Sequence, residues 1–187
     1  LWAIFIDAVN APLQGTMASQ NMLAKINFPR EAIVISGVYQ TLCNSAIKGG
    51  LLLVSLPFFG IALGWHLLLF PFGLLSLIIV GTTIGLLITP VGLLYTDVGK
   101  GMPVLMQFLM YLSPTIFAMP REGGAATLFL LNPITPVIVT ARDWLAGSAP
   151  EYLGYFLAVN AVALLLLLLV WVVYRLAMPI LIERMSA

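Results

Sequence analysis

Side chains that could catalyse a reaction or hold a metal are scarce in this sequence. It contains one histidine, His66, and one cysteine, Cys43, and its acidic residues are scattered singly among apolar runs. One imidazole and one thiol cannot supply a metal centre or a catalytic triad. Gly99-Lys100 is followed by glycine rather than by Ser or Thr, so there is no phosphate-binding P-loop for ATP. We therefore look for a function other than covalent chemistry, and expect no metal and no cofactor in this chain.

Composition places the chain in a membrane. Of its 187 residues, 61% are hydrophobic and 8% are charged, whereas soluble domains carry about 25% charged residues. A soluble fold of this size could not hide so much apolar surface, so lipid must be the solvent for most of it. The net charge of +1 does not indicate nucleic acid or any other partner.

The apolar runs predict an all-α fold, a polytopic bundle of transmembrane helices in a single domain over residues 1–187. We expect about four full spans, the end of a fifth over residues 1–20, and short re-entrant helices over 128–145 before the last span. The chain begins without Met inside an apolar run, so an upstream span is expected to be missing. The four full spans are expected at residues 32–65, 67–96, 102–119 and 152–174.

A polar, basic elbow at residues 21–31 separates the first two apolar runs. Lys25, Arg30 and Glu31 cannot lie cheaply in hydrocarbon, so the elbow should lie at a membrane surface. Pro29 suits the first turn of a new helix. The spans then place a predicted loop at 97–101 and the tail from Arg175 on the same side as the elbow. This side holds five Lys or Arg residues against two on the other, which predicts a cytoplasmic elbow and C-terminus.

Lys48 is the one ionisable residue well inside a predicted span. It could face a water-filled path or pair with a carboxylate in the missing part of the protein. It could equally snorkel towards the surface, or the span could begin later than drawn. The sequence leaves these alternatives open.

Three further features have both a structural and a functional interpretation. The Gly60/Gly64 and Gly81/Gly85 spacings favour close packing within the chain over a dimer face. Arg142-Asp143, after Asn132-Pro133, is better explained as a solvated pair that holds a loop than as a gate. Several aromatic residues could line a sugar path, although lipid-facing or packing roles explain each one at least as well. These are Tyr39, Tyr95, Phe108, Tyr111 and Phe117.

Four motifs in order make the sequence resemble the membrane subunits of ABC-2 type exporters, and most closely the polysaccharide and O-antigen (lipopolysaccharide or capsule) export permeases. The first is Asn27-Phe28-Pro29-Arg30-Glu31 with Asn21, Leu23 and Lys25 upstream, and the second is Tyr95-Thr96-Asp97-Val98. The third is Tyr111-Leu112-Ser113-Pro114, and the fourth is Leu131-Asn132-Pro133 followed by Arg142-Asp143-Trp144-Leu145-Ala146-Gly147. Each is weak alone, but their order and spacing extend over nearly the whole chain.

The resemblance implies a permease subunit of six spans in the bacterial inner membrane, of which this chain would hold the later part. It implies a permease homodimer working with two copies of a separate ABC ATPase, which would bind the ATP and Mg²⁺, and a glycan or lipid-linked glycan as substrate. The elbow would dock on the ATPase through Asn21, Lys25, Asn27, Phe28, Pro29, Arg30 and Glu31. Asp97, Gly99 and Lys100 would form a second cytoplasmic contact, and Asn132, Pro133, Arg142 and Asp143 would lie in the outer re-entrant region.

Three rival functions differ in what they require. An ABC-2 permease for a small hydrophobic drug or a lipid would share the architecture and differ in substrate. A membrane-embedded transferase would need acidic or histidine clusters at the end of a span, and the sequence has none. A passive membrane scaffold would not associate with an ATPase.

Overall fold

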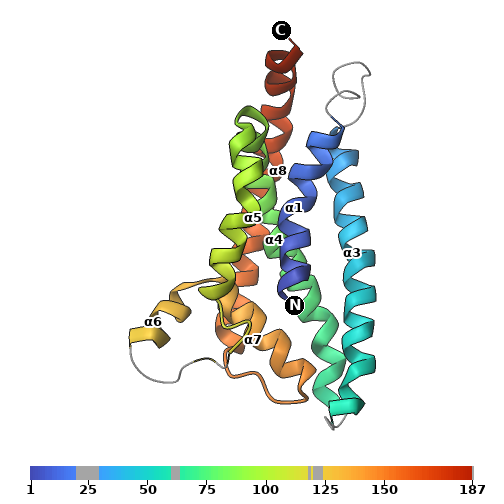
Figure 1. Cartoon of the computed structure of the whole chain (residues 1–187), viewed down its shortest axis with the longest axis vertical. Helices are drawn as coiled ribbons and strands as arrows, with labels where there is room; N and C mark the ends of the chain where they lie inside the picture. The colour runs from blue at the N-terminus through green and yellow to red at the C-terminus, as the bar shows by residue number, and fades with distance from the viewer. Residues whose placement is uncertain (20–29, 60–63, 118, 120–123, 187) are drawn as a thin grey trace.

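The computed structural model describes residues 1–19, 30–59, 64–117, 119 and 124–186, and this part of the chain is all-α, as the sequence predicts (Figure 1). The elements are α1 (Trp2–Ala18), α3 (Arg30–Ser55), η1 (Leu56–Phe59), η2 (Trp65–Leu69), α4 (Phe70–Leu94), α5 (Thr96–Tyr111), α6 (Gly124–Leu131), α7 (Ile134–Leu145) and α8 (Leu153–Ser186).

Three helical stretches within the described residues are long and apolar enough to cross a membrane. They are Glu31–Phe58, Trp65–Leu94 and Leu153–Pro179, with 28, 30 and 27 residues. At about 1.5 Å per residue each exceeds the hydrocarbon core of about 30 Å. The chain therefore has the predicted character of a helical membrane protein, and the part that the structure describes contains three of the four full spans that we expected.

The expected span at 102–119 is the one that differs. α5 has 16 residues and ends at Tyr111, because Ser113-Pro114 follows and a residue before proline is disfavoured in helical geometry. The predicted polar loop at 97–101 is wrong as well, since these residues form the first turns of α5. The chain breaks instead at Tyr95, which is extended. Asp97 then lies in the first turn, where a negative charge is stabilised by the helix dipole.

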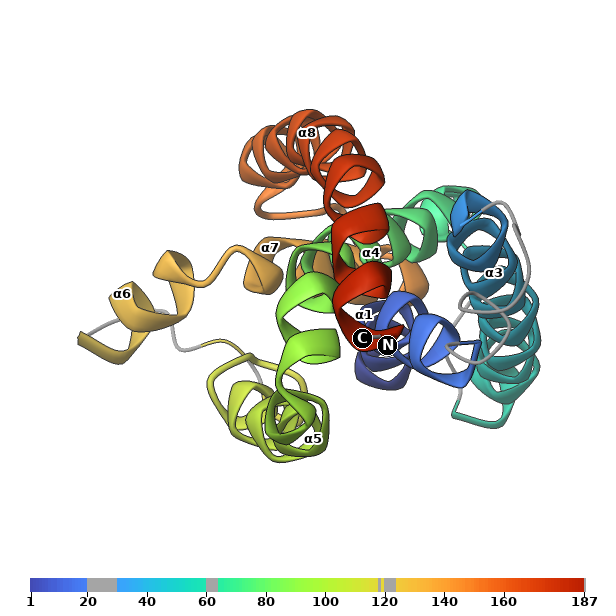
Figure 2. The ribbon, with the colours of Figure 1, turned by 90° about the horizontal axis from the view of Figure 1, so that it is seen from above.

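α4 is the central helix, and glycines bring its neighbours close. A Cβ atom on Gly81 would lie 2.6 Å from Ala8 Cβ, and one on Gly85 would lie 2.3 Å from the Val9 carbonyl oxygen. At the other end of α4 a Cβ on Gly73 would lie 2.8 Å from Ala141 Cβ in α7. The Gly81/Gly85 pair therefore packs within the chain, as predicted, whereas Gly60 lies outside the described residues. Figure 2 shows α1, α3 and α8 around α4, with α5 and α6 towards the edge.

The ends of the helices gather into two groups (Figure 1). The end of α1, the start of α3, the α4–α5 junction and the end of α8 lie at one end of the bundle, and η2, α6 and α7 lie towards the other. This is the grouping that the expected spans require. α6 and α7, with 8 and 12 residues, are too short to span, as expected for this region. The predicted tail is not separate, because α8 continues as one helix through Arg175 to Ser186.

Candidate functional site

A polar groove runs between α1 and α3. The two helices come close where Gly37 faces Ala11, since a Cβ on Gly37 would lie 3.2 Å from the Ala11 carbonyl oxygen. Beside this contact the helices border an open-sided cavity of about 530 Å³, which is within the range of about 300–1,000 Å³ found for ligand pockets. Its lining is Asp7, Asn10, Ala11, Gln14, Gly15, Ala18, Ser19, Ala32, Ile33, Ser36, Gly37, Gln40, Thr41 and Asn44.

The polar residues of the groove follow helical spacing on both walls. On α1, Asp7, Asn10 and Gln14 are three and four residues apart, and on α3 Ser36, Gln40 and Asn44 follow at intervals of four. Residues at these intervals lie on one face of a helix. Each wall therefore presents a polar stripe inside an otherwise apolar helix. Sequence reasoning missed this pattern, although the four-residue interval in α3 was available to find it.

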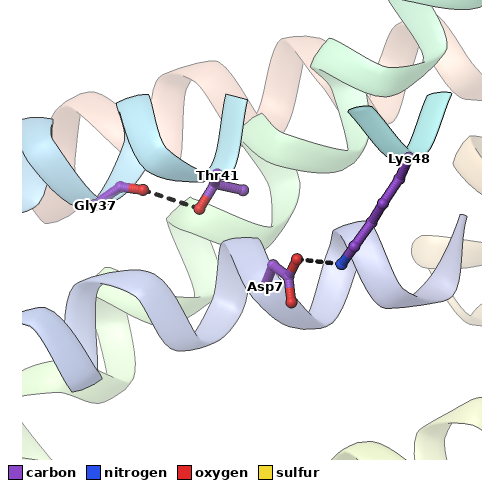
Figure 3. A network of polar contacts seen from close by, with 4 residues as sticks. All are labelled: Asp7, Gly37, Thr41 and Lys48. Atoms are coloured by element: carbon purple, nitrogen blue, oxygen red, sulfur yellow. Dashed lines mark hydrogen bonds and ion pairs between the residues drawn. The ribbon is translucent and has the colours of Figure 1, made fainter. Parts of the chain in front are cut away.

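An ion pair closes one end of this polar face. Lys48 Nζ lies 2.5 Å from Asp7 Oδ2, one helical turn beyond Asn44, so the pair joins α3 to α1 (Figure 3). The side chains are 39% and 34% exposed, so the pair is partly open to its surroundings. Of the alternatives left open for Lys48, pairing with a carboxylate is the one observed. The partner, Asp7, lies within this chain.

Most polar side chains of the groove have no partner within the described part of the chain. Thr41 is the exception on α3, because its hydroxyl donates to the Gly37 carbonyl at 2.9 Å (Figure 3). Among described residues, no hydrogen bond is formed by the side chains of Asn10, Gln14, Ser36, Gln40 or Asn44. Their amide and hydroxyl groups are therefore available to water or to a ligand.

Two contacts tie the elbow end of the groove to α8. Thr16 Oγ1 at the end of α1 lies 3.3 Å from Tyr174 Oη, in a buried position. Glu31 Oε1 at the start of α3 lies 3.1 Å from Arg175 Nε. Of the predicted coupling residues, Arg30 begins α3 and Glu31 pairs with α8. The remaining five, Asn21, Lys25, Asn27, Phe28 and Pro29, lie outside the described residues.

Asn132 holds the junction between α5, α6 and α7. Its side-chain amide donates to the Leu112 carbonyl at 3.2 Å and to Ser113 Oγ at 2.9 Å, and its Oδ1 accepts from the Ile134 N–H at 3.0 Å. Ser113 is fully buried. The sequence motifs around Ser113-Pro114 and Asn132-Pro133 therefore meet in space. Pro133 itself provides the turn into α7.

Arg142 fixes the segment that follows α5. Its Nη1 donates to the carbonyl oxygens of Pro114 and Phe117, at 3.2 and 3.3 Å. Asp143 accepts from the Glu151 N–H at 3.5 Å, and partial burial raises the pKa of the Asp143 carboxyl above its ordinary value. Both residues thus contact loop backbone, whereas no ion pair among the described residues joins Arg142 to Asp143. The interpretation as a solvated pair stays a prediction. Here, unlike in the groove, the polar side chains form hydrogen bonds with other described residues of the protein.

The five predicted pathway aromatics do not form one cluster. Tyr39 lies on α3 and is 69% exposed, whereas Tyr95, Phe108 and Tyr111 are exposed in or next to α5. Phe117 packs edge-on against Phe129 with ring centroids 5.3 Å apart. The second cytoplasmic contact with the ATPase was predicted at Asp97, Gly99 and Lys100. Asp97 and Lys100 are exposed on α5, and Gly99 is partly buried. A transport role for any of these residues stays a prediction.

Comparison with known proteins finds similarity to an export permease. No protein-family model matches the chain. The O-antigen export system permease protein RfbA of Myxococcus xanthus is 20% identical over 142 residues, which are 74% of this chain and 55% of the relative. The chain thus spans about half the length of the curated relative that it matches. This similarity supports the resemblance to export permeases that the sequence motifs indicate.

Proposed function

We propose that this chain is the membrane-spanning part of a permease subunit of the ABC-2 type, which exports a polysaccharide or a lipid-linked glycan from the cytoplasm. The observation that carries the proposal is the similarity to an O-antigen export permease along 74% of the chain. It is supported at the coarser level of a membrane transport subunit by the all-α fold and its three apolar helices. Scarce catalytic residues in the sequence favour transport over an enzyme.

In this proposal the energy comes from a partner. Two copies of a separate ABC ATPase bind ATP with Mg²⁺ and close, and their motion pushes the elbow of each permease in a homodimer. α3 begins at Arg30, in the last two residues of the elbow, and continues for 26 residues, so a push on the elbow acts on a long lever. The Glu31–Arg175 pair transmits part of this push to α8.

The proposed location is the bacterial inner membrane, with the elbow and C-terminus in the cytoplasm. This orientation rests on the excess of Lys and Arg that the sequence predicts on the side of the elbow. The end of α1 and the start of α3 lie at one end of the bundle (Figure 1). The α4–α5 junction, with Asp97 and Lys100 exposed on α5, lies at the same end. It is therefore the second surface that we assign to the ATPase, although as a helix start rather than as a loop.

A hydrophobic drug or a lipid is the alternative substrate, and one observation favours it. An apolar groove of about 470 Å³ lies between α3, α4 and α8 and includes Tyr39, Leu86 and Trp171 in its lining. A groove of this kind would accept an acyl chain or an apolar drug. In a helix bundle that faces lipid, ordinary membrane lipid would occupy it as well.

Deletion of the gene and measurement of surface glycan tests the proposal. We expect the deletion strain to retain glycan inside the cell and the complemented strain to export it. Arg30→Glu should reduce export while membrane insertion and protein level stay normal, because the elbow would no longer fit the ATPase. Normal export in the deletion strain, together with loss of resistance to an apolar drug, would favour the alternative. A scaffold is distinguished by failure of the ATPase to co-purify.

A further inference from the structure

We propose that the polar groove between α1 and α3 is a binding site for an uncharged, polyhydroxylated ligand, and that the Asp7–Lys48 pair closes its deep end. This inference rests on the proposed function and assigns a place on this chain to the exported glycan. The lining combines carboxamides from both helices with the hydroxyl of Ser36. Carboxamides donate and accept hydrogen bonds at once, as sugar hydroxyls do.

The groove has a direction across the membrane. It extends from Ala18, Ser19 and Ala32 beside the elbow to Asp7 and Asn44. From residue 18 to residue 7 of α1 the rise is about 16 Å at 1.5 Å per residue, roughly half of a hydrocarbon core of about 30 Å. A ligand could therefore enter at the elbow end and reach about the middle of the bilayer along polar side chains.

The lining selects a polar occupant over an apolar one. In hydrocarbon every unpaired amide or hydroxyl costs several kcal/mol, so polar side chains within spans face water, a polar ligand or a polar partner. An apolar helix laid over Gln40 and Asn44 would leave both amides without partners. Water or sugar hydroxyls would satisfy them.

The charges of the groove select an uncharged occupant. Asp7 is the one ionisable residue in the described lining, and Lys48 neutralises it at 2.5 Å. No Lys or Arg among the described lining residues would attract a phosphate or carboxylate. The ligand segment held here should therefore be neutral sugar, with any charged lipid carrier outside the groove.

Cysteine labelling tests the site in the complete permease with its ATPase, in the host cell. Exposed Cys43 is first replaced by serine, and single cysteines are introduced as Gln40→Cys, Asn44→Cys and Leu42→Cys. Leu42 is the matched control, because it lies between the other two positions and lines the apolar groove instead. Permeabilised, ATP-depleted cells are treated with a charged methanethiosulfonate reagent, in one strain that makes glycan and in one whose glycan synthesis is blocked.

We expect labelling at positions 40 and 44 and none at 42 when glycan is absent, and loss of labelling at 40 and 44 when glycan is present. No labelling at 40 and 44 without glycan would mean that protein fills the groove, and would overturn the proposal. Equal labelling at 40 and 44 with and without glycan would show a hydrated groove that holds no glycan, and would overturn it too. If position 42 were labelled as strongly as positions 40 and 44 without glycan, reagent access would not be specific to the groove. This result would also overturn the proposal.

Export measured in the same strains separates the two proposals. Gln40→Leu with Asn44→Leu removes the hydrogen bonds of two amides and should lower the rate of glycan export about tenfold, whereas Leu42→Val should leave it unchanged. Normal export by the double variant would reject the groove site alone. Failure of glycan export to depend on the gene at all would reject the proposed function.

Discussion

Helix α1 packs against two neighbours in opposite ways. Towards α4 the contact is tight and dry, because Gly81, Gly85 and Gly92 let the backbone and side chains of α1 approach without an intervening Cβ. Phe5, Ala8 and other residues of α1 on this contact are buried in the main core. Such close contact of small residues is how helices associate in a membrane.

Towards α3 the contact is more polar. The helices pack where Gly37 faces Ala11 and where Gly15 faces Ile33, and the Asp7–Lys48 pair adds a polar attachment (Figure 3). Beside these points lie side chains without partners in the described residues. The difference is that the contact with α4 is filled by close packing at glycines, whereas the contact with α3 combines packed residues with an open polar groove.

Substitutions at the contact between α1 and α4 should lower stability more than substitutions at the contact between α1 and α3. Gly85→Ala should have the largest effect. The new Cβ would lie 2.3 Å from the Val9 carbonyl oxygen and 3.1 Å from Pro12 Cδ, so α1 must shift. We expect a loss of about 3 kcal/mol in the free energy of unfolding, the upper part of the usual range for overpacking. Thermal unfolding of the purified protein in detergent measures this loss.

Gly50→Ala is the matched control for this substitution. Its Cβ would meet nothing within 4 Å, and it also lies in a long helix. It should raise the free energy of unfolding by about 0.5 kcal/mol through helix propensity. If the two substitutions had equal effects, the distinction between a tight and a loose neighbour of α1 would be wrong.

Loss of the Asp7–Lys48 ion pair should have the next largest effect on stability. Lys48→Met leaves the Asp7 carboxylate unpaired within the bundle, which would cost about 3–5 kcal/mol at a fully buried site. Because both groups are more than a third exposed, we expect about 2 kcal/mol. The thermal unfolding midpoint in detergent or nanodiscs should fall accordingly, with α3 becoming more accessible to protease.

The double variant Asp7→Asn with Lys48→Met separates pairing from packing. It leaves no charge unpaired, so most of the lost stability should return. Stability of the double variant below that of Lys48→Met would mean that each charge has a separate partner, and would contradict the pairing.

Several features of the fold could be predicted from the sequence. Apolar runs and prolines predicted an all-α membrane fold and the grouping of helix ends, because length and hydrophobicity are properties of each segment alone. The Gly81/Gly85 spacing likewise predicted packing within the chain. These features need no knowledge of which helices are neighbours.

Several unpredicted features depend on neighbours. Asp7 and Lys48 are 41 residues apart, and only the antiparallel placement of α1 and α3 brings them together. The hydrogen bonds of Asn132 and Arg142 to the carbonyl groups that follow α5 likewise join segments far apart in the sequence, although the end of α5 itself has a local cause in Ser113-Pro114. The groove was missed because its two stripes become a site only when they face each other.

Gly37→Ala should have a moderate effect. The added Cβ would lie 3.2 Å from the Ala11 carbonyl oxygen and 3.4 Å from Ala11 Cβ, so α3 must move by a few tenths of an ångström. We expect about 1 kcal/mol of destabilisation, less than at Gly85, because the nearest atom is 3.2 Å rather than 2.3 Å from the added Cβ. Thermal unfolding compared with Gly85→Ala measures the difference. An effect as large as that at Gly85 would show that α3 is held as rigidly as α4.

The smallest effect on stability is expected in the groove itself. Gln40→Leu with Asn44→Leu removes two exposed amides that bond to no described residue, so the free energy of unfolding should change by less than about 0.5 kcal/mol. The same double variant should lose glycan export, whereas Gly85→Ala should lose stability first. Unfolding midpoints and export measured side by side therefore test whether the two faces of α1 have separate roles. If the double variant unfolded as readily as Lys48→Met, the two amides would be part of the packing between helices, and the groove would be a structural interface rather than a path.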